Sequence, residues 1–386
     1  MWVIVPLDIS VFLGQIAEMR ENDLPAALQA SELARHAGEI IDASLPVDEE
    51  KLNALHRAWA INTRRAFKSD LTLWGQWCRM KRVLPAEATE RDVAAWIRAL
   101  SGVDESTLKV RRPATIERYL VSVGRAYRLL NLPDPTKGEL VGLERTAMGK
   151  KLGKRQRQAK GIRYRGDIAD YDSPAKGICV EHLVRVCRQD ALGDRDRALL
   201  SIAYDSACRR SELVAIECEH IEGPDADGAG QLFIPESKTD PNKKGEYAYL
   251  SPKTMHAIAR WRKSGDIKSG PLLRRVSTHF DGSIDSIGLE ALHPNSIGKI
   301  YRRLARRAYN KGLLGKMSRE RFEQELRGIS SHSIRVGVAQ DNFAADENLP
   351  AIMQSYRWKD PRTVLRYGAK LSTKSGAAAR MAKRFE

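Results

Sequence analysis

The sequence lacks any apolar segment long enough to span a membrane, and it lacks low-complexity runs. Hydrophobic residues make up 42% and charged residues 30% of the 386 positions, which excludes a disordered chain and a stack of apolar spans. No positively charged segment opens the chain in the manner of a signal peptide, and Asp8 interrupts its first apolar residues. These absences predict a soluble, cytoplasmic protein with no membrane partner.

Cysteine is scarce and has no metal-binding spacing. The count is odd, and no Cys-x-x-Cys pair occurs. The sequence also shows no obvious set of converging Asp and Glu residues that suits two-metal catalysis. We therefore expect reduced, structural thiols and neither a metal site nor a cofactor. The five cysteines are Cys78, Cys179, Cys187, Cys208 and Cys218.

Positive charge is in excess. Lys and Arg total 65 against 49 Asp and Glu, which gives a formal net charge of +16. This excess favours a polyanionic partner, although many soluble proteins are basic without binding nucleic acid. At this length we expect two domains, each able to bury its own core.

Residues from about 49 to 146 have helical periodicity, with apolar residues recurring at three and four positions. A Thr89 and Asp92 pair forms a capping box at the start of one expected helix. We predict a small helical domain over 49–146, preceded by an extension of unassigned role over 1–48. Its expected core stripes contain Phe67, Leu71, Trp74 and Cys78, then Val93, Trp96, Ile97 and Leu100, then Ile116, Leu120, Val123 and Tyr127.

A basic, aperiodic stretch follows, and we predict an interdomain linker over 147–176. Between Gly149 and Gly166 it contains no acidic residue. Such a run suits the phosphates of DNA, and a merely solvated hinge is the alternative. The candidate DNA-binding residues in it are Lys150, Lys151, Lys154, Arg155 and Arg157.

The pattern over 177–386 is mixed. Helices are expected around 196–207 and from Ser211, and the segments at 232–234 and 247–250 flank a turn and predict a β-hairpin. We predict helices for the remainder, including 295–313, whose basic face adds the DNA-binding candidates Arg302, Arg303 and Arg306. The fold class is therefore mainly α with a small β-hairpin or sheet (α+β).

Four features occur in order in this second half. They are Ser206-Ala-Cys-Arg-Arg-Ser-Glu-Leu213, Lys238 beside the hairpin turn, His332-Ser-Ile-Arg335, and Trp358 followed nine positions later by Tyr367. His332 and Arg335 are three positions apart and share one helix face, so both can converge on one phosphate. Tyr367 follows Asp360-Pro361, a helix start with an Asp cap and Pro at the first position.

In order, spacing and flanking residues these features resemble the catalytic domain of tyrosine site-specific recombinases and phage integrases. The resemblance covers roughly 177–380 well and the helical region more loosely, and it implies a DNA-binding role for the helical domain over 49–146. The arginine motif departs from the family's usual Thr-Gly-Leu-Arg, because Ser206-Ala-Cys208 precedes Arg209 here. Trp358 occupies the position that often holds a second histidine.

The resemblance implies the following catalytic set: Tyr367 as nucleophile, Arg209, Arg335, His332 and Trp358 as phosphate ligands, and Lys238 as general acid. Arg209 and Arg210 compete for the first arginine role, because adjacent helical residues point about 100° apart. Glu212 would hold Arg209 in place, and an ordinary exposed helix pair is the alternative. Lys238 has the alternative of a plain hairpin-edge lysine, and Trp358 that of a packing residue.

A second His-x-x-Arg match, at His182 and Arg185, has no tyrosine in register, and we interpret it as part of a structural helix. The C-terminal segment 371–385 has two interpretations, a helix that packs on a neighbouring protomer and a frayed tail.

The resemblance further implies a reaction and its partners. A 3′-phosphotyrosyl intermediate would form on double-stranded DNA without metal or ATP, with a homodimer on each inverted-repeat site and a homotetramer in synapsis. Strand exchange would pass through a Holliday junction. The rival hypotheses are a type IB topoisomerase-like enzyme and a DNA-binding protein that has lost catalysis.

Overall fold

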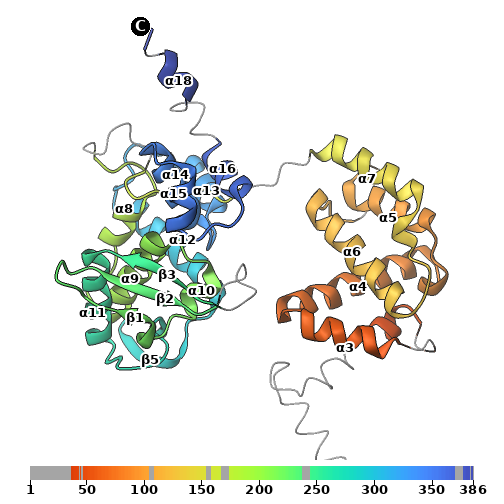
Figure 1. Cartoon of the computed structure of the whole chain (residues 1–386), viewed down its shortest axis with the longest axis horizontal. Helices are drawn as coiled ribbons and strands as arrows, with labels where there is room; N and C mark the ends of the chain where they lie inside the picture. Colours follow the sequence, from red (N-terminus) through yellow and green to blue (C-terminus); the bar gives the residue numbers. More distant parts are fainter. Residues whose placement is uncertain are drawn as a thin grey trace, which may run out of the picture. The chain divides into compact units, whose positions relative to one another are not determined.

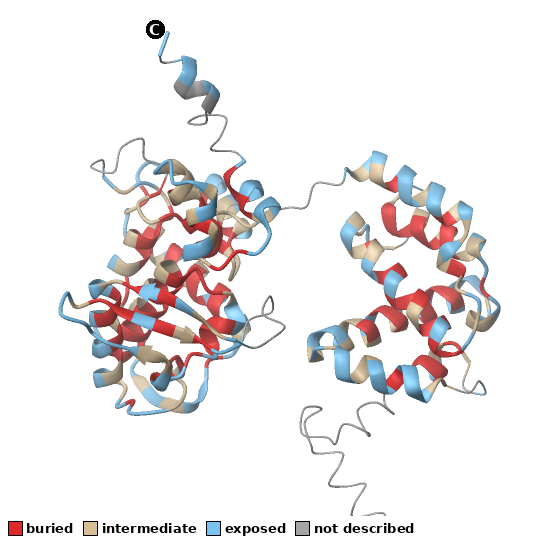
Figure 2. Ribbon diagram, viewed as in Figure 1, coloured by how far each residue is buried: buried red, intermediate tan, exposed pale blue. Residues whose placement is uncertain are grey.

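The computed structural model describes residues 36–42, 44, 47–103, 108–153, 158–166, 174–236, 244–369, 377–382 and 384–385. The chain divides into two compact units, Met1–Gln156 and Arg157–Glu386, which Figure 1 draws in warm and cool colours. Each unit has its own hydrophobic core (Figure 2).

The N-terminal unit consists of helices alone over its described residues. Its elements are α3 (Glu49–Ala58), α4 (Ile61–Lys81), η1 (Pro85–Glu87), α5 (Glu90–Ser101), α6 (Pro113–Leu129), η2 (Pro135–Lys137) and α7 (Glu139–Leu152).

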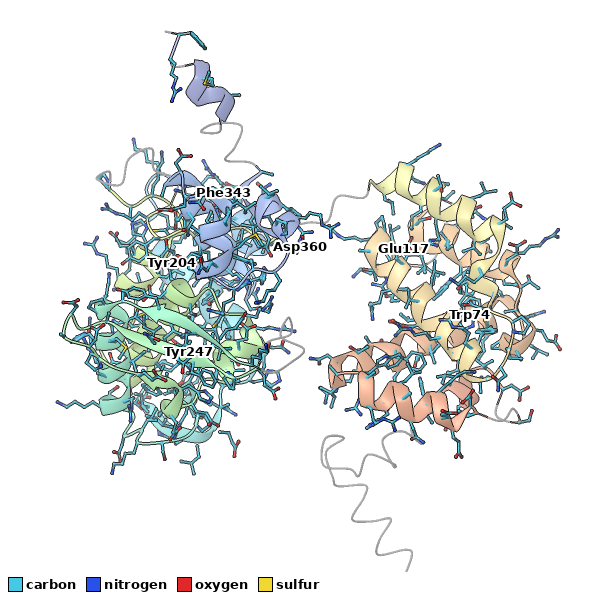
Figure 3. All side chains as sticks on the ribbon, in the orientation of Figure 1. Trp74, Glu117, Tyr204, Tyr247, Phe343 and Asp360 are labelled. Carbon is cyan, nitrogen blue, oxygen red and sulfur yellow. The ribbon has the colours of Figure 1, made fainter. Side chains whose placement is uncertain are left out.

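All twelve apolar residues of the three predicted stripes are buried in this unit. Trp74, labelled in Figure 3, lies in α4 and stacks at a tilt on Trp96 of α5, with 5.0 Å between ring centroids. The capping box also forms, because the Asp92 carboxylate accepts hydrogen bonds from the Thr89 backbone N–H and hydroxyl, both at 2.8 Å. Local periodicity therefore predicted this core correctly.

The boundaries of the helical region differ from expectation at both ends. Ala37 and Ile41 are buried in its core, so part of the segment expected to be a separate extension packs with the helices. Helix α7 continues to Leu152, so Lys150 and Lys151 lie in its last turn rather than in an aperiodic linker.

The C-terminal unit combines helices with two small antiparallel sheets, and the predicted class, mainly α with small β elements, is confirmed. Its helices are α8 (Val180–Arg185), α9 (Ala191–Ser206), α10 (Arg210–Val214), η3 (Cys218–His220), α11 (Pro252–Ser264), α12 (Pro294–Asn310), α13 (Arg319–Gly328), α14 (Ser333–Ala344), α15 (Leu349–Ser355), α16 (Pro361–Gly368) and α18 (Ala377–Ala382). Its strands are β1 (Ile221–Glu222), β2 (Gly230–Ile234), β3 (Glu246–Leu250), β4 (Arg274–Thr278) and β5 (Ile284–Ala291).

The first sheet has the order β1-β2-β3, and β2 pairs with β3 in the register Leu232 to Ala248. This pair is the predicted hairpin. The prediction that only helices follow it was wrong, because β4 and β5 form a second antiparallel pair. That pair contains a register irregularity between Arg274 and Val276, which disturbs the strict alternation by which a strand is recognised in sequence.

The segment 158–166 packs on α14 of the C-terminal unit. The Ile162 N–H donates to the Ser333 carbonyl at 2.9 Å, and the buried Arg163 pairs with Asp341 at 2.6 Å. A Cβ on Gly337 of α14 would clash with the Ile162 carbonyl. This part of the predicted linker is therefore a packed strap rather than a solvated hinge.

All five cysteines are free and buried. Burial raises the pKa of Cys187 to about 12 and that of Cys179 to about 11. Both thiols are therefore protonated, unreactive core groups at neutral pH. His182 is also structural, as expected, because its Nδ1 lies 2.8 Å from the Gly177 carbonyl at the buried start of α8.

Candidate active site

The first element of the candidate site is the turn between α9 and α10. Helix α9 ends at Ser206, and Ala207 adopts the left-handed conformation with φ of 47°. Arg209 is the N-cap residue of α10. Its backbone N–H and its Nη1 both donate to the Glu212 carboxylate, at 2.8 and 2.7 Å.

This geometry distinguishes the two neighbouring arginines. Arg209 lies close enough to His332 and Arg335 to lower the pKa of each. Arg210 instead lies on the surface and donates to the Asn295 side chain at 3.0 Å. Glu212 is 7% exposed, and its carboxylate accepts from both the backbone and the side chain of Arg209. It is therefore not an ordinary exposed helix residue.

The second element is the start of α14, where His332 is the N-cap residue and Arg335 lies in the first turn. The Arg335 side chain is 3% exposed. Its Nη1 donates to the Ala207 carbonyl, and its guanidinium carbon lies 4.6 Å from the centroid of the Trp358 ring. Its Nη2 is buried and makes no hydrogen bond to any residue that the structure describes.

The third element is α16, which begins as predicted. The Asp360 carboxylate (labelled in Figure 3) caps it by accepting from the Arg362 N–H at 2.9 Å, and Pro361 is its first residue. Tyr367 lies near its end and is buried. A Cβ on the next residue, Gly368, would clash with the Phe343 ring, so α16 packs tightly on α14.

Tyr367 faces the other candidates. Its hydroxyl lies 2.7 Å from the His332 Nε2, and its ring centroid is 6.4 Å from that of Trp358. Trp358 is also buried, and its indole N–H has no hydrogen-bond partner in the described part of the chain. Trp358 and Arg335, both close to the tyrosine, therefore each keep an N–H donor that has no partner among the described residues.

The electrostatics of the cluster are dominated by burial and by positive charge. Burial, with Arg335, Arg209 and Arg366 adding to it, lowers the pKa of His332 to about 4. Burial and the neighbouring Arg209 lower the pKa of Arg335 to about 10. Each positive charge disfavours the others, so an anion bound among them would relieve that repulsion.

The structure thus brings six predicted residues into one cluster. They are Arg209, Glu212, His332, Arg335, Trp358 and Tyr367. Lys238 lies outside the described residues, and so do Lys154, Arg155 and Arg157 of the basic segment. Lys150 is exposed, and Lys151 donates to the Gly102 carbonyl at 2.5 Å.

The three arginines predicted to form a basic face on α12 differ in their exposure and in their contacts. Arg302 donates to the Ile329 carbonyl at 2.8 Å, and Arg303 pairs with Asp196. Arg306 is exposed. Two of the three DNA-binding candidates on this helix therefore also make intramolecular contacts that helical periodicity does not reveal.

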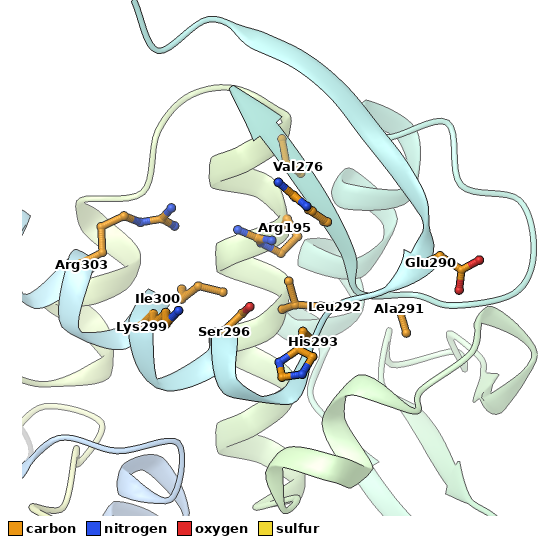
Figure 4. A pocket seen from close by; sticks show the side chains of 11 residues that line it. Arg195, Val276, Glu290, Ala291, Leu292, His293, Ser296, Lys299, Ile300 and Arg303 are labelled. Carbon is orange, nitrogen blue, oxygen red and sulfur yellow. The ribbon is translucent and has the colours of Figure 1, made fainter. Parts of the chain in front are cut away.

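A pocket of about 540 Å³ lies elsewhere in the C-terminal unit, between α9, the β4–β5 pair and the start of α12 (Figure 4). Arg195, Arg275, Lys299 and Arg303 line it together with Glu290. None of the six clustered residues contributes to its lining. It is a basic hollow separate from the candidate active site.

Two arginines of the cluster were missed in the sequence. Arg357 is buried directly before Trp358, and Arg366, directly before Tyr367, lies 5.9 Å from that ring. Their adjacency to two motif residues was the available signal. Neither arginine belongs to the spacing pattern of the catalytic motifs, and their proximity to the clustered side chains follows from the fold.

Buried arginines, a histidine and a tyrosine gather in one cluster, an arrangement that can bind a phosphate ester beside the tyrosine hydroxyl. No protein-family model matches the chain. The recombinase Cre of Escherichia phage P1 is 25% identical over 357 residues, covering 88% of this chain and 95% of Cre. An integrase/recombinase XerD homolog of Selenomonas ruminantium is 25% identical over 323 residues, covering 81% and 83%.

Solved structures share the fold. The XerH site-specific recombinase bound to palindromic difH substrate, a post-cleavage complex, superposes with a TM-score of 0.53 at 11% identity, covering 90% of this chain and 96% of that one. The Tn1549 transposon integrase in complex with transposon right end DNA gives 0.51 at 11% identity, covering 89% and 98%. These likenesses support the assignment of this chain to the tyrosine recombinases, whose members break and rejoin DNA strands.

Proposed function

We propose that this enzyme is a site-specific DNA recombinase in which Tyr367 attacks the scissile phosphate and carries the broken strand as a 3′-phosphotyrosyl ester. One observation carries the proposal most strongly. The Tyr367 hydroxyl lies 2.7 Å from His332, next to two buried donors, Arg335 Nη2 and Trp358 Nε1, that lack partners among the described residues. Buried donors without partners are costly, and a phosphate would satisfy them.

The arginines supply the electrostatic part of the mechanism. Guanidiniums donate paired hydrogen bonds to phosphate oxygens and remain charged. Arg209 and Arg335 would bind the non-bridging oxygens and stabilise the charge that builds on them in the transition state, with Trp358 as a further donor. Glu212 keeps Arg209 oriented for this task.

His332 supplies the proton acceptor. Its lowered pKa makes the imidazole neutral at pH 7, so its Nε2 can accept the proton of the Tyr367 hydroxyl as the oxygen attacks phosphorus. The bond between phosphorus and the 5′ oxygen then breaks, and Lys238 would give that oxygen a proton. Because the phosphotyrosyl ester conserves the bond's free energy, a 5′ hydroxyl can reverse the step without ATP or metal.

The assembly part of the proposal comes from the family resemblance. A homodimer would bind each inverted-repeat site, and two sites would synapse as a homotetramer that exchanges strands through a Holliday junction. The net charge of +16 and the exposed Lys150 and Arg306 suit a DNA backbone. Lys154, Arg155 and Arg157 lie outside the described residues and are DNA-binding candidates from the sequence alone. None of the helices described here is both long and apolar enough to cross a membrane, and we propose a cytoplasmic location.

The test begins by selecting bound sites from random DNA with the full chain. The recovered repeat is then placed twice in a supercoiled plasmid and incubated with the protein. We expect recombinant circles and, on denaturing gels, a covalent protein–DNA adduct. Tyr367→Phe should retain site binding and lose the adduct completely, because the phenyl ring has no nucleophilic oxygen.

The alternatives give different products. Relaxation of the plasmid without recombination would identify a type IB topoisomerase-like enzyme. Binding with no adduct from the wild type would identify a DNA-binding protein without catalysis. An adduct that survives in Tyr367→Phe would remove Tyr367 from the nucleophilic role.

A separate substrate tests Lys238. Lys238→Ala should form the adduct slowly on ordinary DNA, by roughly a hundredfold, because the leaving 5′ oxygen lacks its proton donor. DNA with sulfur in place of that bridging oxygen should restore most of the rate, since a thiolate leaves without protonation. Equal defects on the two substrates would assign the acid to another residue.

A further inference from the structure

Arg357 is the second buried arginine of the described cluster, after Arg335, and the proposed mechanism does not use it. Its side chain is about as buried as that of Arg335, at 6% exposed. Its Nη2 donates to the Ser206 carbonyl at 3.0 Å and approaches the Cys208 sulfur at 3.4 Å. Arg357 therefore contacts the same turn that presents Arg209.

The backbone at this contact is strained on both sides. Arg357 has φ of 56° and Ala207 has φ of 47°. Residues with a Cβ adopt this left-handed conformation at a cost of about 1 kcal/mol, which glycine avoids. An arginine held in such a conformation, with its charge buried, is unfavourable unless its contacts are needed.

The polar groups of the turn are held from several directions. Arg357 donates a hydrogen bond to the Ser206 carbonyl, and Arg335 donates one to the Ala207 carbonyl. The Glu212 carboxylate accepts one from the Arg209 N–H. The Cys208 N–H lies 3.3 Å from the Ser206 hydroxyl oxygen. Loss of Arg357 would leave a buried carbonyl unpaired at the point where the chain leaves α9.

Arg357 also contacts the sheet. Its Nε lies 3.9 Å from a carboxylate oxygen of Glu246, the first residue of β3, and Lys359 pairs with the other oxygen. The guanidinium thus lies between the end of α9, the start of β3 and the loop before Trp358. Of these segments, the end of α9 leads directly to Arg209, which is a predicted phosphate ligand.

We propose that Arg357 is a positioning residue for DNA cleavage, which fixes the Ser206–Cys208 turn so that Arg209 meets the scissile phosphate. This inference rests on the proposed recombinase function. It goes beyond that function because Arg357 acts through Arg209 rather than through a contact with the reacting atoms.

The experiment is a double-mutant cycle on the full chain. Adduct formation is timed on the selected site carrying a 5′-bridging sulfur, which lets slow variants accumulate product. Arg357→Met should slow the wild-type rate by about tenfold, the usual effect of losing a residue that orients a ligand. In an Arg209→Ala background the same change should slow the rate by less than about twofold, because the positioned group is already absent.

Arg195→Met is the matched control. Arg195 is another buried arginine, 3% exposed, which donates to Asp196 at 2.8 Å and to the Arg274 carbonyl at 3.1 Å. It lies near the opposite end of α9, about 16 Å along the helix from Ser206. Its effect on the rate should be the same factor in both backgrounds, as for any change that acts on folding alone.

Arg357→Lys provides a second variant in case the methionine variant does not fold. Lysine keeps the charge and the aliphatic chain but has a single nitrogen in place of the planar guanidinium. Arg357→Lys should therefore slow adduct formation in the wild-type background and have less effect in the Arg209→Ala background, as Arg357→Met does. Equal factors for Arg357 variants in both backgrounds, or no loss in the wild-type background, would overturn the inference. Absence of an adduct from the wild type would instead contradict the proposed function.

Discussion

The two units bury charge in different ways. In the N-terminal unit, the carboxylate of the fully buried Asp70 accepts hydrogen bonds from Arg118 at 3.0 Å and Ser122 at 2.8 Å. In the C-terminal unit, Arg335 and Arg357 are buried next to each other and to Arg209, and each retains an N–H with no partner among the described residues. The first arrangement pairs one carboxylate with one arginine, whereas the second gathers three arginines around the carboxylates of Glu212 and Glu246, which leaves positive charge in excess.

This difference separates a structural charge from a functional one. A buried charge that has its counter-charge and its hydrogen bonds is compensated, and removing its partner destabilises the folded state. A cluster of buried cations opposes folding until an anion enters. Under the proposed function, the C-terminal unit would therefore give up stability to keep a phosphate site ready, whereas the N-terminal unit would not.

The largest expected effect comes from Arg335→Met, which removes a cation from the cluster. Adduct formation should fall by at least about a hundredfold, because a donor to the transition state is lost. The free energy of unfolding should not fall, because removal of a buried charge offsets the hydrogen bond that the Ala207 carbonyl loses. Denaturant unfolding and adduct gels measure the two quantities; a variant that loses both stability and activity would contradict the comparison.

Arg118→Met should have the opposite effect in the N-terminal unit. It leaves the buried Asp70 with Ser122 as its main hydrogen-bond donor, and burial already raises the pKa of that carboxyl. The free energy of unfolding should fall by about 2 kcal/mol, less than for a pair that is buried on both sides. Arg118→Lys, which keeps the positive charge, is the control and should lose less than half as much.

The smallest effect concerns pH. The pKa of His332 falls from 6.5 to about 4 on folding, so between these values the unfolded state binds more protons than the folded state. Stability should therefore rise as pH rises from 4 to 6.5 and be lost as pH falls. Between pH 6.5 and pH 4.5, the free energy of unfolding of the wild type should fall by about 2 kcal/mol more than that of His332→Gln. Denaturant unfolding at the two pH values measures this difference. Identical pH slopes would exclude a neutral His332 in the folded cluster.

Local patterns predicted much of the fold. The helical stripes around Trp74 and Trp96, the Thr89 capping box and the Asp360 cap before Tyr367 all depend on residues a few positions apart, and all form. The β4–β5 pair was missed because its irregular register weakens alternation. The packing of segment 158–166 on α14 was missed because its partners lie about 170 positions away along the chain, which periodicity does not encode.

The sequence alone determined the residue types of the site, their order and the faces of the helices that carry them, since helix geometry fixes which neighbours share a face. Tertiary structure decided which arginine points inward and what holds it. Arg209 rather than Arg210 lies beside His332, and Arg357 reaches Ser206 across 151 positions of chain. The reason is physical: side-chain periodicity follows from local backbone geometry, whereas the partner of a buried charge is set by whichever distant segment packs against it.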